Sequence, residues 1–423
     1  MSDSIIDLSD LRSGPTRSPR SRDGAVAAAR RPGLVNVNPQ VAAVASPPIP
    51  EARGWAARYD GAHGPAIDLT QAVPGYAPDP NLMARMADAA RHPETYSYGP
   101  ITGDLALREA YAADVSRLYD GRVGADEVAI TTGANMASLA VTMLVAKAGD
   151  AIMLPVPWYF NHQMNAGLLG VDVVPLPCRP ENGFVPDPAE AARRVGRRVK
   201  AIFLVSPNNP TGAVYPPETV AAFAELCRKR NILLVVDETY RDFRPADLDR
   251  PHDLLRTEWQ SHVVQLYSFS KSYCVPGFRA GAVIAGRPVM AELTKILDCM
   301  QICAPRIGQA GLSWAIDALG DWREGNRVLM NRRGRACREA FDGLPRWALD
   351  SQGAYFAYLR HPFEGVSSWR VAEELAAHQG VVTLPGAAFG PGQENHLRLA
   401  FANVDEAAIA GVAERLRDFR LSN

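Results

Sequence analysis

Short apolar runs recur along the middle of the chain and predict buried strands. The clearest are Ala201–Val205 (AIFLV) and Ile232–Val236 (ILLVV), neither of which alternates with polar residues. Strands that are apolar on both sides are typical of a parallel sheet with helices on both faces. Between these runs, Pro217–Arg230 places its apolar residues on one stripe at helical spacing. The alternation predicts an α/β domain with a mostly parallel central sheet flanked by helices.

Other segments extend the same pattern. Five more runs have the length and composition of strands: Val128–Thr131, Ala151–Leu154, Val171–Pro175, His262–Tyr267 and Ala280–Ala285. The stretch from Gly133 to about Ala146 is expected to be a helix that follows the first of these strands.

The pattern changes near Trp322. A long arginine-rich helix, Arg327–Phe341, is followed by strand-like Ala354–Leu359 and by a helix near Trp369–His378. Short strands are expected at Val381–Leu384 and His396–Phe401, before a helical end. This succession indicates a separate, smaller α+β domain.

We therefore expect four regions. Residues 1–33, rich in Ser, Arg, Pro and Ala without periodicity, are expected to be a disordered tail. Residues 34–75 contain several prolines and are expected to be an arm that belongs to the small domain. Residues 76–321 would form the large domain, and residues 322–423 the rest of the small domain.

Charge and composition exclude some partners. Of the 423 residues, 47% are hydrophobic and 22% charged, and the formal net charge is −1. Such a chain has no overall field to attract nucleic acid or an anionic membrane. The first 33 residues lack an apolar core segment and do not predict a signal peptide.

Cysteine usage indicates a reducing compartment. The six cysteines form no CxxC pair, and no histidine cluster accompanies them at metal-ligand spacing. No metal site is expected, and a cytoplasmic protein with free thiols is the simplest interpretation.

Polar motifs follow the carboxyl ends of the predicted strands, where ligands gather in open α/β sheets. The first strand runs into Gly133-Ala134-Asn135 at the start of a helix, an arrangement whose backbone amides suit a phosphate. The strand Ala201–Val205 leads into Ser-Pro-Asn-Asn-Pro-Thr-Gly, which contains Asn209. Each turn alone could be purely structural.

Two further strand ends carry ionisable groups. Asp237 ends a fully apolar strand, with Tyr240 three residues later, and a carboxylate there needs a cation or hydrogen-bond donors unless it only caps the next helix. Lysine occurs at only five positions, and Lys271 stands in Ser268-Phe-Ser-Lys with Arg279 eight residues on. This pattern suits a lysine that forms a Schiff base beside a phosphate anchor.

The order of these motifs resembles that of the class I/II pyridoxal-phosphate-dependent aminotransferases, which are fold-type-I enzymes of the aspartate aminotransferase family. The resemblance covers about residues 35–423. It implies that Lys271 carries pyridoxal 5'-phosphate and moves the substrate proton, and that Asp237 keeps the cofactor ring nitrogen protonated. It also implies that Asn209 and Tyr240 bond the ring oxygen.

The resemblance assigns further residues around the cofactor. Tyr159 would stack on the ring, although adjacent Trp158 leaves the register open, and His162 would orient Asp237 or be a plain core histidine. The phosphate would be held by Gly133, Ala134, Asn135, Ser268 and Arg279. Tyr98, in Tyr-Gly-Pro-Ile-Thr-Gly, looks like the tyrosine that reaches the phosphate of the neighbouring subunit, which implies a homodimer with shared active sites.

The resemblance also assigns residues that would contact the substrate. Arg398 matches the arginine that grips the substrate carboxylate in a bidentate fork. Ala72 stands where the family usually has a glycine, and its methyl group could narrow the pocket. Arg306 is near the region where a second carboxylate partner would lie but could as well begin a helix, so an uncharged or aromatic substrate side chain is preferred.

The expected reaction is ping-pong transamination between an α-amino acid and a 2-oxo acid. The same motifs would serve a lyase, a cyclopropane-forming synthase or an oxygen-using amino-acid oxidase. A non-enzymatic ligand sensor is a further alternative, but such regulators carry an N-terminal DNA-binding domain, for which 33 residues are too few.

Overall fold

The computed structural model describes residues 37–422. The tail expected over residues 1–33 lies outside them. The largest sheet contains β2 (Val128–Thr131), β3 (Ala151–Val156), β4 (Asp172–Pro177), β5 (Val199–Val205), β6 (Leu233–Asp237), β7 (Val263–Ser268) and β8 (Gly281–Ala285). Their order is β2-β8-β7-β6-β5-β3-β4. Of these seven strands, β8 is antiparallel to both neighbours and the remaining pairs are parallel, as predicted.

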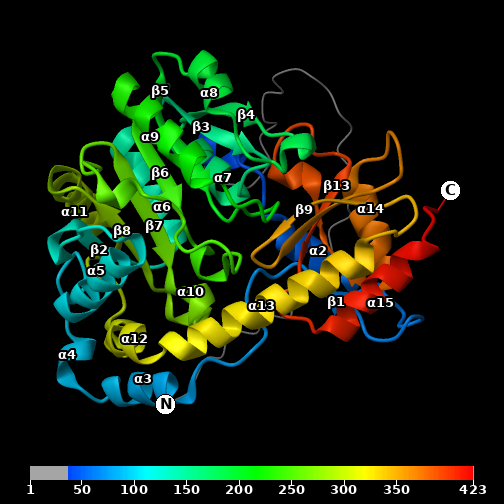
Figure 1. Ribbon diagram of the computed structural model, residues 1–423, viewed down its shortest axis with the longest axis horizontal. Helices are drawn as coiled ribbons and strands as arrows, with labels where there is room; N and C mark the ends of the chain where they lie inside the picture. The colour runs from blue at the N-terminus through cyan, green and yellow to red at the C-terminus, as the bar shows by residue number, and fades with distance from the viewer. Residues whose placement is uncertain (1–36, 423) are drawn as a thin grey trace.

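Helices cover both faces of this sheet because each central strand is apolar on both sides (Figure 1). In β6, Leu234 and Val236 join one core cluster, whereas Val235 joins the other. The face that carries Val235 packs against α6 (Ala134–Val145), α7 (Phe160–Leu168) and α11 (Arg287–Gln301). The opposite face packs against α3 (Pro80–Ala89), α5 (Leu105–Tyr119), α8 (Pro188–Arg194), α9 (Pro217–Arg230) and α12 (Arg306–Ala318). The short helix α4 (Pro93–Tyr96) contacts α12.

A second, antiparallel sheet lies beyond the large one. Its order is β12-β13-β10-β9, formed by β9 (Ala348–Gly353), β10 (Phe356–Arg360), β12 (Leu384–Pro385) and β13 (His396–Ala400). The helices of this part are α13 (Gly320–Phe341), α14 (Ser368–Glu374), which continues as one π-helical turn over Leu375–Gln379, and α15 (Glu406–Arg417). Within residues 37–422, none of the helices combines the length and the apolar composition that a membrane span requires.

The N-terminal arm contacts both parts, because its first helix packs on α7 of the first sheet while the rest of the arm packs on the second part. It comprises α1 (Pro39–Ala43), α2 (Pro48–Ala56) and β1 (Ile67–Asp68). The strand β1 pairs in parallel with β11 (Val381–Val382). Ala52 and Trp55 of α2 belong to the same core cluster as the residues of β10 and β13.

Three elements differ from the sequence prediction. The expected strand Ala354–Leu359 begins only at Phe356, because Ala354 has φ 46° and lies in the turn between β9 and β10. The strand β9 was not predicted, since its sequence ALDSQG is half-buried throughout and has no apolar alternation. The long helix α13 begins at Gly320, so the expected boundary at residue 322 falls inside it, and Figure 1 shows it running from α12 to α15.

The two sheets touch through a pair of glycines. A Cβ atom on Gly353, at the end of β9, would lie 2.1 Å from the carbonyl oxygen of Gly212, in the turn after β5. A Cβ on Gly212, whose φ is +76°, would lie 2.2 Å from the Gly353 nitrogen. Backbone therefore meets backbone where the two parts join.

Candidate active site

One cavity collects most of the residues predicted for the site. Ten of its lining residues were predicted from the sequence: Ala134, Asn135, Tyr159, His162, Asn209, Asp237, Tyr240, Ser268, Lys271 and Arg279. Val205, Thr239, Ser270 and Pro276 complete the lining. Residues from five separate loops meet there because the carboxyl ends of the parallel strands lie at one edge of the sheet.

Lys271 lies in α10 (Phe269–Ser272), directly after β7. Burial, together with the positive charges of Arg279 and Arg398, lowers the pKa of its amine to about 8. A buried lysine beside other cations is the usual way to obtain a nucleophilic amine near neutral pH. Ser268 begins this helix, and its hydroxyl accepts the backbone N–H of Ser270 at 3.3 Å.

Asp237 is held as a carboxylate from two sides. Its Oδ2 lies 3.1 Å from Nε2 of His162. Its Oδ1 accepts the Thr239 hydroxyl at 2.7 Å and the Thr239 backbone N–H at 3.0 Å. Burial acts to raise the pKa of Asp237, but the bonds from His162 and Thr239 outweigh burial and lower it. The carboxylate therefore keeps its negative charge inside the protein.

Thr239 was missed in the sequence analysis. A hydroxyl residue two positions after an aspartate commonly donates to the aspartate side chain in a local turn, and this pattern could have identified Thr239.

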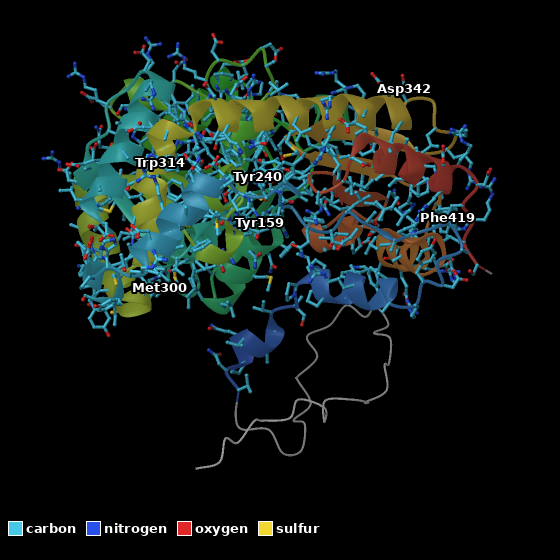
Figure 2. The ribbon with its side chains drawn as sticks, turned by 90° about the horizontal axis from the view of Figure 1, so that it is seen from below. Tyr159, Tyr240, Met300, Trp314, Asp342 and Phe419 are labelled. Atoms are coloured by element: carbon cyan, nitrogen blue, oxygen red, sulfur yellow. The ribbon has the colours of Figure 1, made fainter. Side chains whose placement is uncertain are left out.

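Two tyrosines from separate loops line the cavity. Figure 2 shows Tyr159 and Tyr240 near the middle of the molecule, and both line the cavity. Asn209 donates from Nδ2 to the Tyr240 hydroxyl at 3.2 Å, while its buried Oδ1 has no partner among the described residues. Burial raises the pKa of Tyr159 to about 12. The neighbouring Trp158 lines a different cavity, so of these two adjacent aromatic residues only Tyr159 lines the cavity that contains Lys271.

A cationic corner lies at the start of α6. Gly133 has φ +84°, and a Cβ there would fall 2.3 Å from Nη2 of Arg279. The same guanidinium donates to the Thr132 carbonyl at 3.5 Å. The first N–H groups of α6 and one arginine therefore face the cavity together, which is an arrangement that binds anions.

Arg398 lies on β13 and does not itself line the cavity around Lys271. It is 2% exposed, and its Nη2 donates to the Thr70 carbonyl at 2.5 Å. Its guanidinium carbon lies 5.6 Å from the Phe356 ring and 5.7 Å from the Phe389 ring. Burial lowers the pKa of Arg398 to about 10, and its Nε has no partner among the described residues. A buried guanidinium with a free donor is suited to receive a carboxylate.

Ala72 lies on the N-terminal arm, two residues after Thr70, whose carbonyl accepts the hydrogen bond from Arg398. The carbonyl of Ala72 accepts the Tyr355 hydroxyl at 3.1 Å, and its side chain packs against the core cluster of the second sheet. Ala72 does not line the cavity around Lys271.

Tyr98 is not brought to the cavity of its own chain. Its side chain is 81% exposed, and the next residue, Gly99, donates its N–H to Sγ of Cys303 at 3.5 Å. Arg306 lies beside this segment, with Nη2 2.9 Å from Oδ1 of Asp104. The same guanidinium donates to the Glu94 carbonyl, so it is already engaged.

The family can now be assigned. The sequence profile described as aminotransferase class I and II matches residues 65–416, most of the 423-residue chain. The chain belongs to this family and is an aminotransferase.

Named relatives support the assignment without agreeing on a substrate. An arginine–pyruvate transaminase of Pseudomonas aeruginosa is 31% identical over 310 residues, 71% of this chain and 77% of that protein. An aromatic aminotransferase of Arabidopsis thaliana is 28% identical over 360 residues, covering 83% and 89%. A valine–pyruvate aminotransferase of Mycobacterium tuberculosis is 29% identical over 357 residues, covering 82% and 89%.

Solved structures show the same fold. The aspartate aminotransferase of Thermus thermophilus with maleate superposes with a TM-score of 0.83 at 24% identity, covering 91% of this chain and 99% of that one. A methionine aminotransferase from Escherichia coli gives 0.83 at 24% identity, covering 91% and 100%. The expected fold class is therefore confirmed.

Proposed function

We propose that this aminotransferase uses pyridoxal 5'-phosphate and passes the amino group of an α-amino acid with an uncharged side chain to a 2-oxo acid in a ping-pong reaction. One observation carries the proposal. A half-buried lysine whose amine has a pKa of about 8 shares a cavity with a buried carboxylate and with an arginine at a helix N-terminus.

The cavity fits this cofactor on its own geometry. The Gly133 turn leaves open a space that a Cβ would fill, under the Arg279 guanidinium, and this corner suits the phosphate. The unpartnered Oδ1 of Asn209 and the unpartnered hydroxyl of Ser270 are buried polar atoms that a ligand could satisfy. Gly133, Ala134, Asn135, Ser268 and Arg279 would hold the phosphate.

When bound, pyridoxal phosphate supplies an aldehyde for the amino group and a ring that withdraws electrons from the substrate Cα. Asp237, kept anionic by His162 and Thr239, would hold a proton on the ring nitrogen. Asn209 and Tyr240 would donate hydrogen bonds to the ring oxygen, and Tyr159 would cover one face of the ring. His162 acts through Asp237 and is a positioning residue in this scheme.

Lys271 and Arg398 would act on the substrate itself. Once released from the cofactor, the Lys271 amine would take the proton from the substrate Cα and pass it to the cofactor. With this lowered pKa about a tenth of the amine is neutral at pH 7, far more than for an ordinary lysine, and only the neutral form can act as a base. Arg398 would grip the carboxylate with its free donors and so fix the orientation of the Cα–H bond.

An uncharged substrate side chain is favoured by the charges around the site. Arg306, weighed from the sequence as a partner for a second carboxylate, is paired with Asp104 and with the Glu94 carbonyl. Aromatic rings of Phe356 and Phe389 flank Arg398. The methyl group of Ala72 packs on the core of the second sheet and does not line the cavity around Lys271, so it has no part in this preference.

A cytoplasmic homodimer is part of the proposal. All six cysteines are free thiols, in keeping with a reducing compartment. Tyr96, Tyr98 and Ile302 are exposed at 74%, 81% and 48%, and such apolar exposure is typical of an interface. In the dimer, Tyr98 would reach the phosphate of the partner's site.

Cofactor absorbance provides the test. The purified protein is loaded with pyridoxal phosphate, amino acids are added one at a time without oxygen, and the absorbance of the bound cofactor is followed. A donor shifts the absorbance in a single turnover, and a 2-oxo acid such as pyruvate reverses the shift. Borohydride should fix the cofactor on Lys271. No binding, or label on another lysine, would contradict the proposal.

A further inference from the structure

The residues that follow Asp237 and Lys271 turn away from the cavity into a buried polar cluster. Glu238 and Ser272 are 0% and 3% exposed, and neither lines the cavity. They lie toward the core face that contains Tyr119 and Tyr267, opposite the face on which His162 meets Asp237. We define the polar cluster as Asp114, Glu238, Arg241, Asp242, Tyr267, Ser272 and Arg323.

Tyr267 links this cluster to the turn that carries Lys271. Its hydroxyl donates to Oδ2 of Asp242 at 2.6 Å and lies 2.6 Å from the Ser272 hydroxyl. Because a phenol has one proton, Tyr267 must accept the bond from Ser272 while it donates to Asp242. The residue next to Lys271 is therefore tied to a buried carboxylate through a single oxygen atom.

Arg323 anchors the other side of Asp242. It lies in the first turn of α13, with Nη1 3.6 Å from Oδ1 of Asp242 and Nη2 3.4 Å from Oδ1 of Asp114. Its guanidinium carbon also stands 5.5 Å from the ring of Tyr273, two residues after Lys271. The helix α13 continues to the second sheet, where it packs on α15 (Figure 1).

Arg241, four residues after Asp237, completes the polar cluster. It is 1% exposed, lies 3.6 Å from Asp114 and stands 4.2 Å above the Tyr267 ring. Glu238 accepts the hydroxyl of Tyr119 at 2.6 Å. Burial opposes ionisation of Asp242, yet Arg241 and Arg323 lower its pKa. Removing one of these charges leaves the others uncompensated in the interior.

We propose that Arg323 and Tyr267 are positioning residues that fix the Lys271 turn relative to α13, through Asp242 and Ser272. The inference rests on the proposed role of Lys271 as the residue that carries the cofactor. It concerns residues that touch neither cofactor nor substrate. Because Arg398 lies on another sheet, the cluster acts on the reacting lysine and leaves the carboxylate grip unchanged.

Tyr267→Phe tests the link that the Tyr267 hydroxyl makes between Asp242 and Ser272. The ring and its stacking remain, and only the link between Asp242 and Ser272 is lost. We expect kcat to fall about tenfold, with the KM for the amino acid unchanged and with a shifted pH midpoint of the cofactor absorbance. Tyr358→Phe is the matched control, since its buried hydroxyl donates to Gln393 at 2.9 Å in the second sheet. It should lower thermal stability without moving the absorbance midpoint.

Arg323→Met and Arg323→Lys test the anchor. The Met variant should give the same shift of the absorbance midpoint as Tyr267→Phe, and the Lys variant should restore part of it. Arg335→Met, at an exposed position of the same helix, is the control and should match the unchanged protein.

The outcomes separate the two proposals. If the unchanged protein binds pyridoxal phosphate on Lys271, but Tyr267→Phe and Arg323→Met alter only thermal stability, the positioning inference is wrong. If the unchanged protein does not bind the cofactor on Lys271, the proposed function itself is wrong.

Discussion

The two sheets supply different halves of the site and hold them differently. The large parallel sheet brings Lys271, Asp237 and the anion corner together at adjacent strand ends, on a rigid frame with helices on both faces. The second sheet contributes Arg398, whose register is fixed by pairing with β10 and whose guanidinium bonds an arm carbonyl. Under the proposed function, the residues that would act on the cofactor and the arginine that would bind the substrate therefore lie on separate sheets. Substitutions on each sheet should affect different kinetic constants.

The largest effect is expected on the parallel sheet. Lys271→Ala should abolish turnover, by about 10⁴-fold, because it removes the base that moves the Cα proton. The variant can still retain the cofactor without a covalent bond. Single-turnover absorbance with the best donor measures the loss, and near-normal rates would contradict the assignment.

Arg398→Ala should show the opposite behaviour on the second sheet. Losing a charge-assisted fork costs roughly 1.5–3 kcal/mol, or about 10- to 100-fold in kcat/KM. We expect the KM for the amino acid to rise while cofactor affinity stays unchanged. Titrations with amino acid and with cofactor, done in parallel, decide the point. Weaker cofactor binding with an unchanged KM would place Arg398 elsewhere.

Gly133→Ala should weaken the binding of pyridoxal phosphate, with a smaller effect than the two substitutions above. Its φ of +84° and the 2.3 Å approach of Arg279 both oppose a side chain there. Strain of this kind costs about 1–3 kcal/mol, and we expect it as a higher Kd for pyridoxal phosphate. Gly277→Ala is the matched control, because a Cβ there meets nothing within 4 Å. Equal Kd values for the two variants would argue against the phosphate corner.

The rate at which the Lys271 amine reacts should depend on pH, and this effect should be smaller than those of the substitutions above. Its amine is neutral, and so nucleophilic, above a pKa of about 8. In the cofactor-free protein, the rate of covalent labelling of Lys271 should rise with pH, with a midpoint near this value, and fall about tenfold per pH unit below it. Mass spectrometry after timed labelling, with Lys271→Ala to identify the site, measures the profile. A midpoint near the ordinary lysine value would show that burial does not tune this amine.

Tyr98→Phe should have the smallest effect. If the hydroxyl reaches the partner's phosphate, its loss removes one hydrogen bond, about 1 kcal/mol or a few-fold in cofactor Kd. Sedimentation should show an unchanged dimer. A monomer that binds the cofactor with full affinity would contradict the shared site.

The same contrast explains what could be predicted from the sequence. The strand-end motifs are local, since a continuous apolar run fixes the strand and the next few residues must lie at its carboxyl end. Lys271, Asp237 and Asn209 were therefore placed without a structure. The strand β9 was missed because its polar residues are half-buried against neighbours that are distant in sequence. The polar cluster behind Lys271 was also missed, since Asp114 and Arg323 meet only after α5 and α13 pack.

The backbone contact between Gly212 and Gly353 restricts how the two positions can change. Neither can acquire a side chain by itself, because the obstacle is the main chain of the other and not a side chain that could be trimmed. A library randomised at either codon should return glycine alone. Even randomising both together offers no compensating pair, so this joint should be among the least tolerant places in the gene.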